Sequence, residues 1–430
     1  MNRVLIIGAD FVPSSLPPAT RIRFFASHLH EFGWEPTVLT TDPTYYESAV
    51  DAENELLIPA ALKIIRTRAF PAKVTRKFGV GDVGMRSIWQ HWRELSRLAK
   101  TQRPDLIFIP VPPGVPMILG RLAHLRFQIP YVIDYIDPWV SDFYRQLPRK
   151  QRPRKWFLSS RLARGLEPFA LKRVNHLTAV SKGTTEQIFN RYGWLSNVGA
   201  TEIPYGAEEG DFQYLRRNPR KNKIFDPADG YLHACYIGAY TEGMKPALCA
   251  LFAAFRQGLE HEPNLFSRIR LHFIGSTYST EGIDPFRVTK VARQCQVEPW
   301  ITEHPQRISY LDSLQTMLEA DGLLLLGSDE PHYTASKVFP YILSRRPLLA
   351  IAHESSSIVS ILRQTRAGFV VSFSNERDPS EQSEEILTYL EKMFSSPATP
   401  EIDWQVFDSY SARTMAARLA GAFQKALNSR

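Results

Sequence analysis

Three stretches near the start of the chain determine the predicted fold: RVLII at 3–7, TRIRFFASHLHEF at 20–32 and PTVLT at 36–40. The first and third are apolar runs of strand length, whereas the middle segment places Ile22 and Phe25 on one face of a helix. A strand, a helix and a strand in this order are typical of a parallel sheet covered by helices.

The same alternation continues along the chain. Strands are predicted at 62–66, 106–109, 131–134 and 176–180, with helices at 87–100, 115–126, 158–173 and 184–192. A polar stretch at 216–230 is typical of a linker or surface loop. Beyond it, strands are predicted at 233–237, 270–274, 300–303, 322–326 and 348–352, with helices at 247–257, 289–295, 309–320, 336–344 and 409–427. We therefore predict an α/β protein with two doubly wound, Rossmann-like domains facing a cleft at the carboxyl ends of their strands.

Length and charge agree with two domains that have different partners. A chain of 430 residues is too long for one core, and 44% hydrophobic with 22% charged residues excludes a disordered, collagenous or coiled-coil protein. The net charge of +8 is unevenly distributed, because residues 1–205 hold 28 basic and 17 acidic residues while the remainder holds 24 and 27. The basic first half indicates an anionic partner such as a membrane surface, a nucleic acid or a phosphorylated substrate.

Cysteine usage and hydropathy suggest a cytoplasmic protein. Cys235, Cys249 and Cys295 are odd in number and far apart, which argues against a disulfide framework or a zinc site. The apolar run at 4–8 ends before it reaches the length of a signal peptide. The uncharged stretch at 106–120 contains four prolines and is shorter than the roughly 20 residues that span a bilayer. Any membrane contact is therefore expected to be peripheral.

The loop at 8–20 follows the first predicted strand. It has a single glycine, so it matches neither the dinucleotide fingerprint nor the phosphate loop, and NAD binding and ATP hydrolysis are disfavoured. The helix that it enters carries Arg21, which either meets a phosphate or carboxylate or lies on a solvated face.

Two carboxylates follow another predicted strand in YVIDYIDPWVSD at 131–142. Asp134 and Asp137 are candidates for a general base or, less strongly because no further ligands cluster nearby, for a metal site. Capping of backbone N–H groups in a turn is the structural alternative.

A basic stretch extends from Arg145 to Arg173, with ten basic residues and one acidic residue, Glu167. Apolar side chains at 156–158 lie among these charges, which suits contact with an anionic lipid surface. Nucleic-acid binding competes with this interpretation but lacks a recognisable motif, and a solvated basic helix is the third alternative.

Three loops of the second half follow predicted strands and precede helices. The segment at 237–245 and the turn at 275–276 can aim backbone N–H groups at an anion, with Lys245 adding a positive charge. The segment EPHYTASKVFPYILSRRP at 330–347 carries hydroxyls and a lysine beside a predicted helix start, and Pro340 must lie in the opening turn or kink the helix. This loop suits a diphosphate, although a plain helix cap with a solvated lysine remains open.

In order and spacing, these segments resemble the GT-B nucleotide-sugar glycosyltransferases, particularly the glycosyltransferase family 4-like group, across nearly the whole chain. The matching landmarks are 4–8, Arg21, 36–40, 134–139, 179–181, 203–206 and 211–212 in the first half, and 236–238, 273–275, 336–339 and 346–347 in the second. The chain departs from many members at His332 and Pro340, where they carry two glutamates, and at Ala239 and Ile136, where they carry arginine.

The resemblance implies transfer of a sugar from a nucleotide-diphosphate sugar to a hydroxyl acceptor, with retained anomeric configuration and with no metal or other cofactor. It implies an acceptor-side domain at 1–205, a donor domain at 206–400 and a C-terminal helical segment at 401–430 that crosses back to the first domain. The implied catalytic residues are Asp137 and Lys337, and the implied acceptor-binding residues are Asp10, Arg21, Asp134 and Asp137. The implied donor-binding residues are Gly238, Tyr240, Thr241, Lys245, Gly275, Ser276, His332, Tyr333, Thr334, Ser336 and Lys337.

The expected partners are a nucleotide sugar and a glycan or lipid-linked acceptor from glycolipid or polysaccharide biosynthesis, with no nucleic acid. Peripheral contact through 145–173 would place the protein at the inner face of a membrane. Three alternatives stay open: a sugar-nucleotide epimerase of the same fold, a catalytically silent homologue that binds a nucleotide sugar or a protein, and a nucleic-acid binder.

Overall fold

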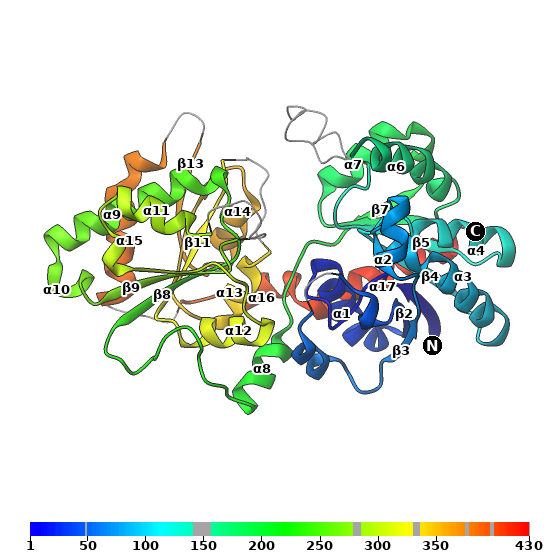
Figure 1. Cartoon of the computed structure of the whole chain (residues 1–430), viewed down its shortest axis with the longest axis horizontal. Coiled ribbons are helices and arrows are strands. Elements are labelled where there is room, and N and C mark those ends of the chain that lie inside the picture. Colours follow the sequence, from blue (N-terminus) through cyan, green and yellow to red (C-terminus); the bar gives the residue numbers. More distant parts are fainter. Residues whose placement is uncertain are drawn as a thin grey trace. The chain divides into compact units, whose positions relative to one another are not determined.

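The computed structural model describes residues 1–47, 50–140, 156–277, 285–329, 336–374, 378–395 and 400–429. The chain divides into two compact units (Figure 1). Unit 1 comprises Met1–Tyr205 and Ala412–Arg430, and unit 2 comprises Gly206–Ser411. The final helix therefore belongs to the same unit as the N-terminus.

The sheet of unit 1 has seven strands in the order β3-β2-β1-β4-β5-β6-β7, and every pairing is parallel. The strands are β1 (Asn2–Ile7), β2 (Trp34–Thr41), β3 (Lys63–Thr67), β4 (Leu106–Val111), β5 (Tyr131–Tyr135), β6 (His176–Ala179) and β7 (Gly199–Glu202). Chain order reverses between β1 and β4. Doubly wound sheets bind ligands beside the carboxyl ends of such a pair.

Alternate side chains of β1 supply two separate apolar cores, because successive residues of a strand point to opposite faces. Leu5 and Ile7 pack in the first core, and Val4 and Ile6 pack in the second. The helices of this unit are α1 (Pro17–His28), α2 (Ala72–Thr75), α3 (Val83–Thr101), α4 (Met117–Phe127), α6 (Trp156–Leu171), α7 (Lys182–Arg191) and α17 (Ala412–Asn428). Residues of α3, α4 and α6 contribute to the first core, and residues of α1 and α17 to the second.

Unit 2 repeats this architecture with a six-stranded parallel sheet in the order β10-β9-β8-β11-β12-β13. Its strands are β8 (Leu232–Ile237), β9 (Ile269–Ile274), β10 (Ile301–His304), β11 (Gly322–Leu326), β12 (Leu348–His353) and β13 (Phe369–Phe373). Its helices are α8 (Glu209–Arg217), α9 (Lys245–His261), α10 (Pro263–Phe266), α11 (Arg287–Gln294), α12 (Tyr310–Glu319), α13 (Val338–Ser344), α14 (Ser357–Thr365), α15 (Ser383–Ser395) and α16 (Trp404–Phe407). The switch point lies between β8 and β11.

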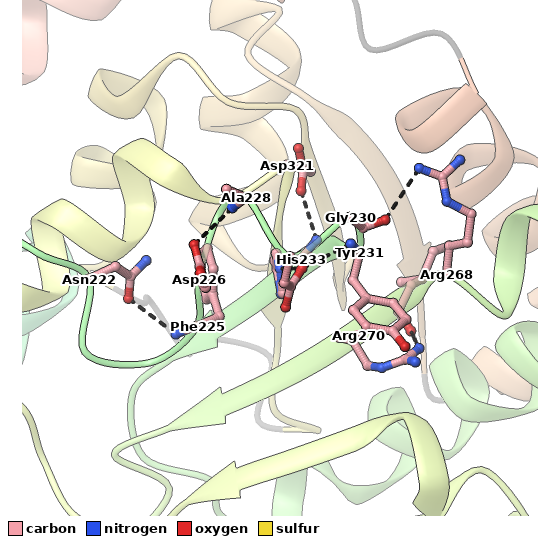
Figure 2. Close-up of polar contacts among 12 residues, drawn as sticks. Asn222, Phe225, Asp226, Ala228, Gly230, Tyr231, His233, Arg268, Arg270 and Asp321 are labelled. Atoms are coloured by element: carbon pink, nitrogen blue, oxygen red, sulfur yellow. Dashed lines mark hydrogen bonds and ion pairs between the residues drawn. The ribbon is translucent and has the colours of Figure 1, made fainter.

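The polar segment before β8 is a surface loop of unit 2 and not a linker between units. Figure 2 shows its local polar contacts, including the bond from the Phe225 backbone N–H to Asn222 Oδ1 at 3.4 Å. The Phe225 ring stacks on His233 with 4.1 Å between centroids, and Asp321 accepts the His233 backbone N–H at 2.8 Å. These contacts hold the segment against the first residues of β8.

The predicted fold class is confirmed: both units are Rossmann-like parallel α/β structures. The sequence interpretation missed α8, α14, α15 and two edge strands, β7 and β13. In β7 all but one residue is exposed, so this strand has no apolar alternation to detect. No helix in the described part of the chain is long and apolar enough to cross a membrane.

We expect Phe423→Ala in α17 to destabilise unit 1 by about 3–5 kcal/mol, the usual effect of removing a buried phenyl ring. Phe423 is fully buried, and its ring centroid lies 5.0 Å from that of Trp34 and 5.4 Å from that of Phe108. Urea denaturation followed by circular dichroism measures the change. The exposed neighbour provides a control, because Gln424→Ala should stay within about 0.5 kcal/mol of wild type. Equal effects of the two substitutions would show that α17 does not stabilise the unit.

Candidate functional site

Lys337 lies at the switch point of unit 2, immediately before α13. Its Nζ donates to the Tyr236 hydroxyl at 2.9 Å and lies 4.0 Å from the centroid of the Tyr236 ring. Gly238, which follows β8, makes room for it, since a Cβ there would come within 2.4 Å of Nζ. Gly238 also has a φ of +142°, a backbone conformation that favours glycine. Glycine at 238 and lysine at 337 therefore depend on each other.

The ammonium group of Lys337 lies in an electrostatically unfavourable place. Burial, followed by the positive charge of Arg307, lowers the pKa of Lys337 to about 7. Arg307 is exposed and lies beside the turn after β9, with its Cγ 3.6 Å from an ideal Cβ built on Gly275. Two cations near each other at the carboxyl ends of β8 and β9 are suited to an anionic ligand, which would offset their repulsion.

The backbone amides expected to bind phosphate are largely engaged within the fold. Gly238 N–H donates to Ile274 O at 2.8 Å, and Tyr240 N–H donates to Ser276 O at 2.9 Å. Gly275 N–H donates to His304 O at 2.7 Å. The prediction that the Gly238 amide binds an anion is therefore corrected, because these amides join neighbouring loops and have no hydrogen left to donate.

A buried carboxylate supports the same loops from behind. Glu303 on β10 accepts from Ser276 Oγ at 2.7 Å and from the Thr289 backbone N–H at 2.8 Å. Arg287, at the start of α11, donates to Tyr240 O at 2.6 Å. Ser276 and Tyr240 are thus residues of the scaffold in this structure.

The remaining donor-side candidates vary in position. Thr241, Lys245 and Ser336 are exposed, with Lys245 at the first position of α9. Pro340 lies in the opening turn of α13, as expected, but that helix has only seven residues, so its macrodipole is small and the lysine supplies most of the charge. His332, Tyr333 and Thr334 lie outside the described residues.

Unit 1 has a pocket of about 250 Å³ at the carboxyl ends of β1, β4 and β5, beside its own switch point. Two of the predicted acceptor residues, Asp10 and Asp137, line this pocket. A third carboxylate, Asp82, lies at the N-cap of α3. Most of the remaining wall is apolar and is formed by Leu16, Pro17, Pro18, Val83, Pro112, Pro113 and Ile136.

All three carboxylates of the pocket have raised pKa values, mainly because surrounding atoms displace water from them. Asp10 is buried and accepts from Ser14 Oγ at 2.9 Å, and the negative charge of Asp82 raises its pKa further. Asp137 is exposed to solvent at the rim. Carboxylates in a partly apolar pocket are suited to accept hydrogen bonds from hydroxyl or amine groups.

Arg21 and Asp134 bind each other, and neither is presented to solvent. Arg21 Nε and Nη2 donate to the two Asp134 oxygens at 2.7 and 3.1 Å, and both side chains are buried. The remaining guanidinium contacts are Ile203 O at 2.8 Å and Pro204 O at 3.1 Å. Thr178 Oγ1 donates to Asp134 at 2.6 Å. The expected direct contacts of Arg21 and Asp134 with an acceptor are therefore corrected, because both residues have a structural role. The alternatives, a solvated helix face for Arg21 and a turn cap for Asp134, are wrong as well.

Sequence reasoning missed Asp82 and Arg307, and it included Tyr236 only as part of the landmark at 236–238 without a role for its side chain. Asp82 directly precedes the long amphipathic α3, so an N-cap signal marked its position. Arg307 carries no local signal, and the contact of Tyr236 with Lys337 could not be predicted, because both depend on which strands become neighbours in the sheet.

Comparison with known proteins agrees with this architecture. Residues 18–206 match the family model described as a glycosyl transferase 4-like domain. No curated protein sequence matches the chain. A glycosyltransferase from Rickettsia africae ESF-5 has 11% identity and a TM-score of 0.61, covering 99% of this chain and 98% of that one.

Two further solved structures are similar over the full length. HepE of Anabaena, solved in complex with UDP and glucose, has 12% identity and a TM-score of 0.60 over 99% of this chain and 100% of that one. An alpha,alpha-trehalose-phosphate synthase (UDP-forming) from Burkholderia vietnamiensis has 12% identity and a TM-score of 0.62 over 100% of both chains.

The two parallel sheets and the full-length similarity to these solved structures show that the chain has the GT-B fold. Within this fold, residues 18–206 match the model of the glycosyl transferase 4-like domain, which agrees with the family that the landmarks in the first half of the sequence indicated.

The lowered pKa of Lys337 predicts a pH-dependent contribution to stability. The ordinary lysine pKa is 10.5, so between about pH 7 and pH 10 the unfolded chain binds more protons at this position than the folded chain does. Wild-type stability should therefore rise with pH in this window, by up to about 1.4 kcal/mol per pH unit.

Lys337→Met should be more stable than wild type at pH 7 and below, with the difference shrinking toward pH 10. Urea denaturation across this range measures it, and the exposed Lys290→Met serves as the matched control. Parallel stability profiles for Lys337→Met and wild type would contradict the assignment of a buried ammonium.

Proposed function

We propose that the protein transfers a sugar from a nucleotide-diphosphate sugar to a hydroxyl acceptor, with retention of anomeric configuration and with no metal ion or other cofactor. The observation that carries the proposal is the position of two cations at the carboxyl ends of neighbouring strands, with Lys337 beside Gly238 after β8 and Arg307 beside Gly275 after β9. In such a transfer, negative charge develops on the departing diphosphate, and its stabilisation is the main electrostatic demand on the site.

Lys337 meets this demand through its environment. Its ammonium group has already lost much of its hydration in the folded protein. Binding of a diphosphate therefore displaces little further water from the lysine, and the electrostatic attraction is strong. The anion raises the pKa of Lys337 and thereby fixes the proton on Nζ. Exposed Lys245 at the start of α9 and the Ser336 hydroxyl provide further contacts for the phosphates.

The pocket of unit 1 supplies the acceptor side in this proposal. Asp10 and Asp82 would accept hydrogen bonds from acceptor hydroxyls, while the prolines of the wall would pack against the C–H faces of a sugar ring. Asp137 at the exposed rim is the catalytic carboxylate, because its raised pKa suits it to accept a hydrogen bond and then a proton from the attacking hydroxyl.

UDP-sugars are the first donors to test. HepE was solved with UDP and glucose, and the trehalose-phosphate synthase is described as UDP-forming. The test begins with a thermal-shift screen of nucleotide diphosphates. Sugar conjugates of the stabilising nucleotide are then incubated with the protein, with and without glycan or glycolipid acceptors. The anomeric configuration of the product is read by nuclear magnetic resonance. Epimerised donor without acceptor would identify an epimerase, and tight binding with no turnover would identify a silent homologue.

Lys337→Ala should lower affinity for the nucleotide diphosphate by about 10- to 100-fold, the usual effect of losing a hydrogen bond to a charged group. Wild-type affinity should fall as the pH rises above about 7, since Lys337 must take up a proton, and the variant should lose this dependence. Isothermal titration calorimetry at several pH values measures both effects, with Lys290→Ala as the control. Unchanged affinity in a folded Lys337→Ala protein would remove the lysine from the donor site.

We further propose a lipid-linked acceptor, reached from the inner face of a membrane, as in glycolipid or polysaccharide biosynthesis. The buried face of α6 contains Ala163 and Glu167, while Phe157 and Leu158 at its start are 58% and 68% exposed. Arg161 is also exposed and stacks on the Phe157 ring at 5.2 Å. An apolar and cationic surface of this kind suits an anionic bilayer. The basic residues at 145–155 lie outside the described residues.

Replacing both exposed apolar residues, as Phe157→Ser with Leu158→Ser, should reduce binding to anionic vesicles by about tenfold or more, because two side chains no longer enter the interface. Vesicle flotation with phosphatidylglycerol-containing liposomes measures it. Phe286→Ser, an aromatic residue of unit 2 with 50% exposure, is the matched control. Equal flotation of the double variant and wild type would exclude α6 as a contact.

A further inference from the structure

We propose that residues 68–81, here called the basic loop, form a second membrane-contact element that inserts its apolar face into the interface of an anionic bilayer. The inference rests on the membrane-bound acceptor of the proposed function and adds a contact that charge patterning at 145–173 does not predict. The loop contains α2, the 3₁₀ turn η4 (Arg76–Phe78) and the glycine that ends it.

Large apolar side chains of the basic loop point into solvent at helical spacing. Phe70 is 49% exposed, Val74 53% and Phe78 82%, and they recur every four residues. Among the described residues, Phe78 is the most exposed large hydrophobic side chain. Three large apolar side chains exposed within the nine residues 70–78 indicate an interaction surface, whereas single exposed apolar residues are ordinary.

The charges in the loop select the partner. Arg68, Lys73, Arg76 and Lys77 are all exposed, and 68–81 contains no acidic residue. Arg76 pairs with Glu47 at 2.8 Å, whereas the other three cations of the loop have no ion pair among the described residues. Cations beside an apolar face attract the anionic headgroups of a bilayer while the aromatic rings enter the boundary below them.

The backbone of the basic loop is prepared for a poorly hydrated environment. Val74 N–H donates to Pro71 O at 3.0 Å, Gly79 N–H donates to Arg76 O at 3.0 Å, and Val80 N–H donates to Thr75 O at 3.0 Å. Gly79 adopts a φ of +83°, which turns the chain back at the end of η4. Internal hydrogen bonds of this kind reduce the penalty for moving peptide groups out of water.

A buried arginine fixes both ends of the loop. Arg86 on α3 is 1% exposed and donates to Phe70 O at 3.0 Å and to Gly81 O at 3.1 Å. It also donates to Tyr45 O at 2.7 Å. The loop is therefore presented as a preformed element whose apolar face is held away from the core of unit 1.

The basic loop also adjoins the acceptor pocket. It follows the carboxyl end of β3 and runs directly into Asp82 and Val83, which line that pocket. A lipid-linked acceptor held in the bilayer would thus present its head group next to the carboxylates, while the loop contacts the lipids around it.

The test is flotation of the full-length protein with vesicles of phosphatidylcholine alone or mixed with phosphatidylglycerol, at low and high ionic strength. The double variant Val74→Ser with Phe78→Ser should bind the mixed vesicles about tenfold more weakly than wild type. The double variant Lys73→Gln with Lys77→Gln should show a similar loss at low ionic strength, and its difference from wild type should disappear at high ionic strength. Phe286→Ser should bind like wild type. Thermal unfolding and nucleotide-diphosphate affinity of every variant show that the fold and the donor site are intact.

The outcomes separate this inference from the proposed function. Loss of flotation in the loop variants with unchanged nucleotide affinity supports the second contact. Wild-type flotation in both loop variants, together with loss in the α6 variant, overturns it and leaves the membrane-bound acceptor standing. If the wild-type protein floats with neither kind of vesicle, the inference is overturned too. Transfer to a water-soluble acceptor then tests the glycosyltransferase reaction by itself.

Discussion

The buried ion pair between Arg21 and Asp134 joins segments of unit 1 that lie 113 residues apart in the sequence. It links α1 to β5, and its remaining bonds reach β6 through Thr178 and the residue after β7 through Ile203 O. A guanidinium and a carboxylate removed from water are tolerated only when nearly all their hydrogen-bonding groups are satisfied, as they are here. Two segments that line the pocket adjoin this pair, because residues 10–18 lead into α1 and residues 136–137 follow β5. The position of the pocket therefore depends on the ion pair.

Net charge and local charge oppose each other in both units. Unit 1 is strongly basic by sequence, yet its pocket is lined by Asp10, Asp82 and Asp137, while α6 and the basic loop carry several of its exposed cations. The acidic unit 2 instead brings Lys337 and Arg307 together at its switch point. The net charge of each unit therefore describes its outer surface and does not predict the charge of its site. The chemistry of the site depends on a few side chains at the carboxyl ends of strands.

The fold was largely predictable because buried parallel strands and amphipathic helices leave strong periodic signals. The exceptions are instructive: β7 is an exposed edge strand, and α14 and α15 lie between the strand predicted at 348–352 and the helix predicted at 409–427, where no element was assigned. The site was predictable only as a set of loops. Whether Arg21 faces a ligand or Asp134, and whether the Gly238 amide is free or bonded to Ile274 O, depends on the neighbouring strand, which a single sequence does not reveal.

The path of the chain has a practical consequence. Since α17 packs in the core of unit 1, unit 1 is discontinuous and unit 2 is an insertion within it, entered after Tyr205 and left before Ala412. A fragment ending at 205 would lack the helix that covers Trp34 and Phe108, whereas residues 206–411 form one continuous segment. During synthesis, the second core of unit 1 can close only after the whole of unit 2 has been made.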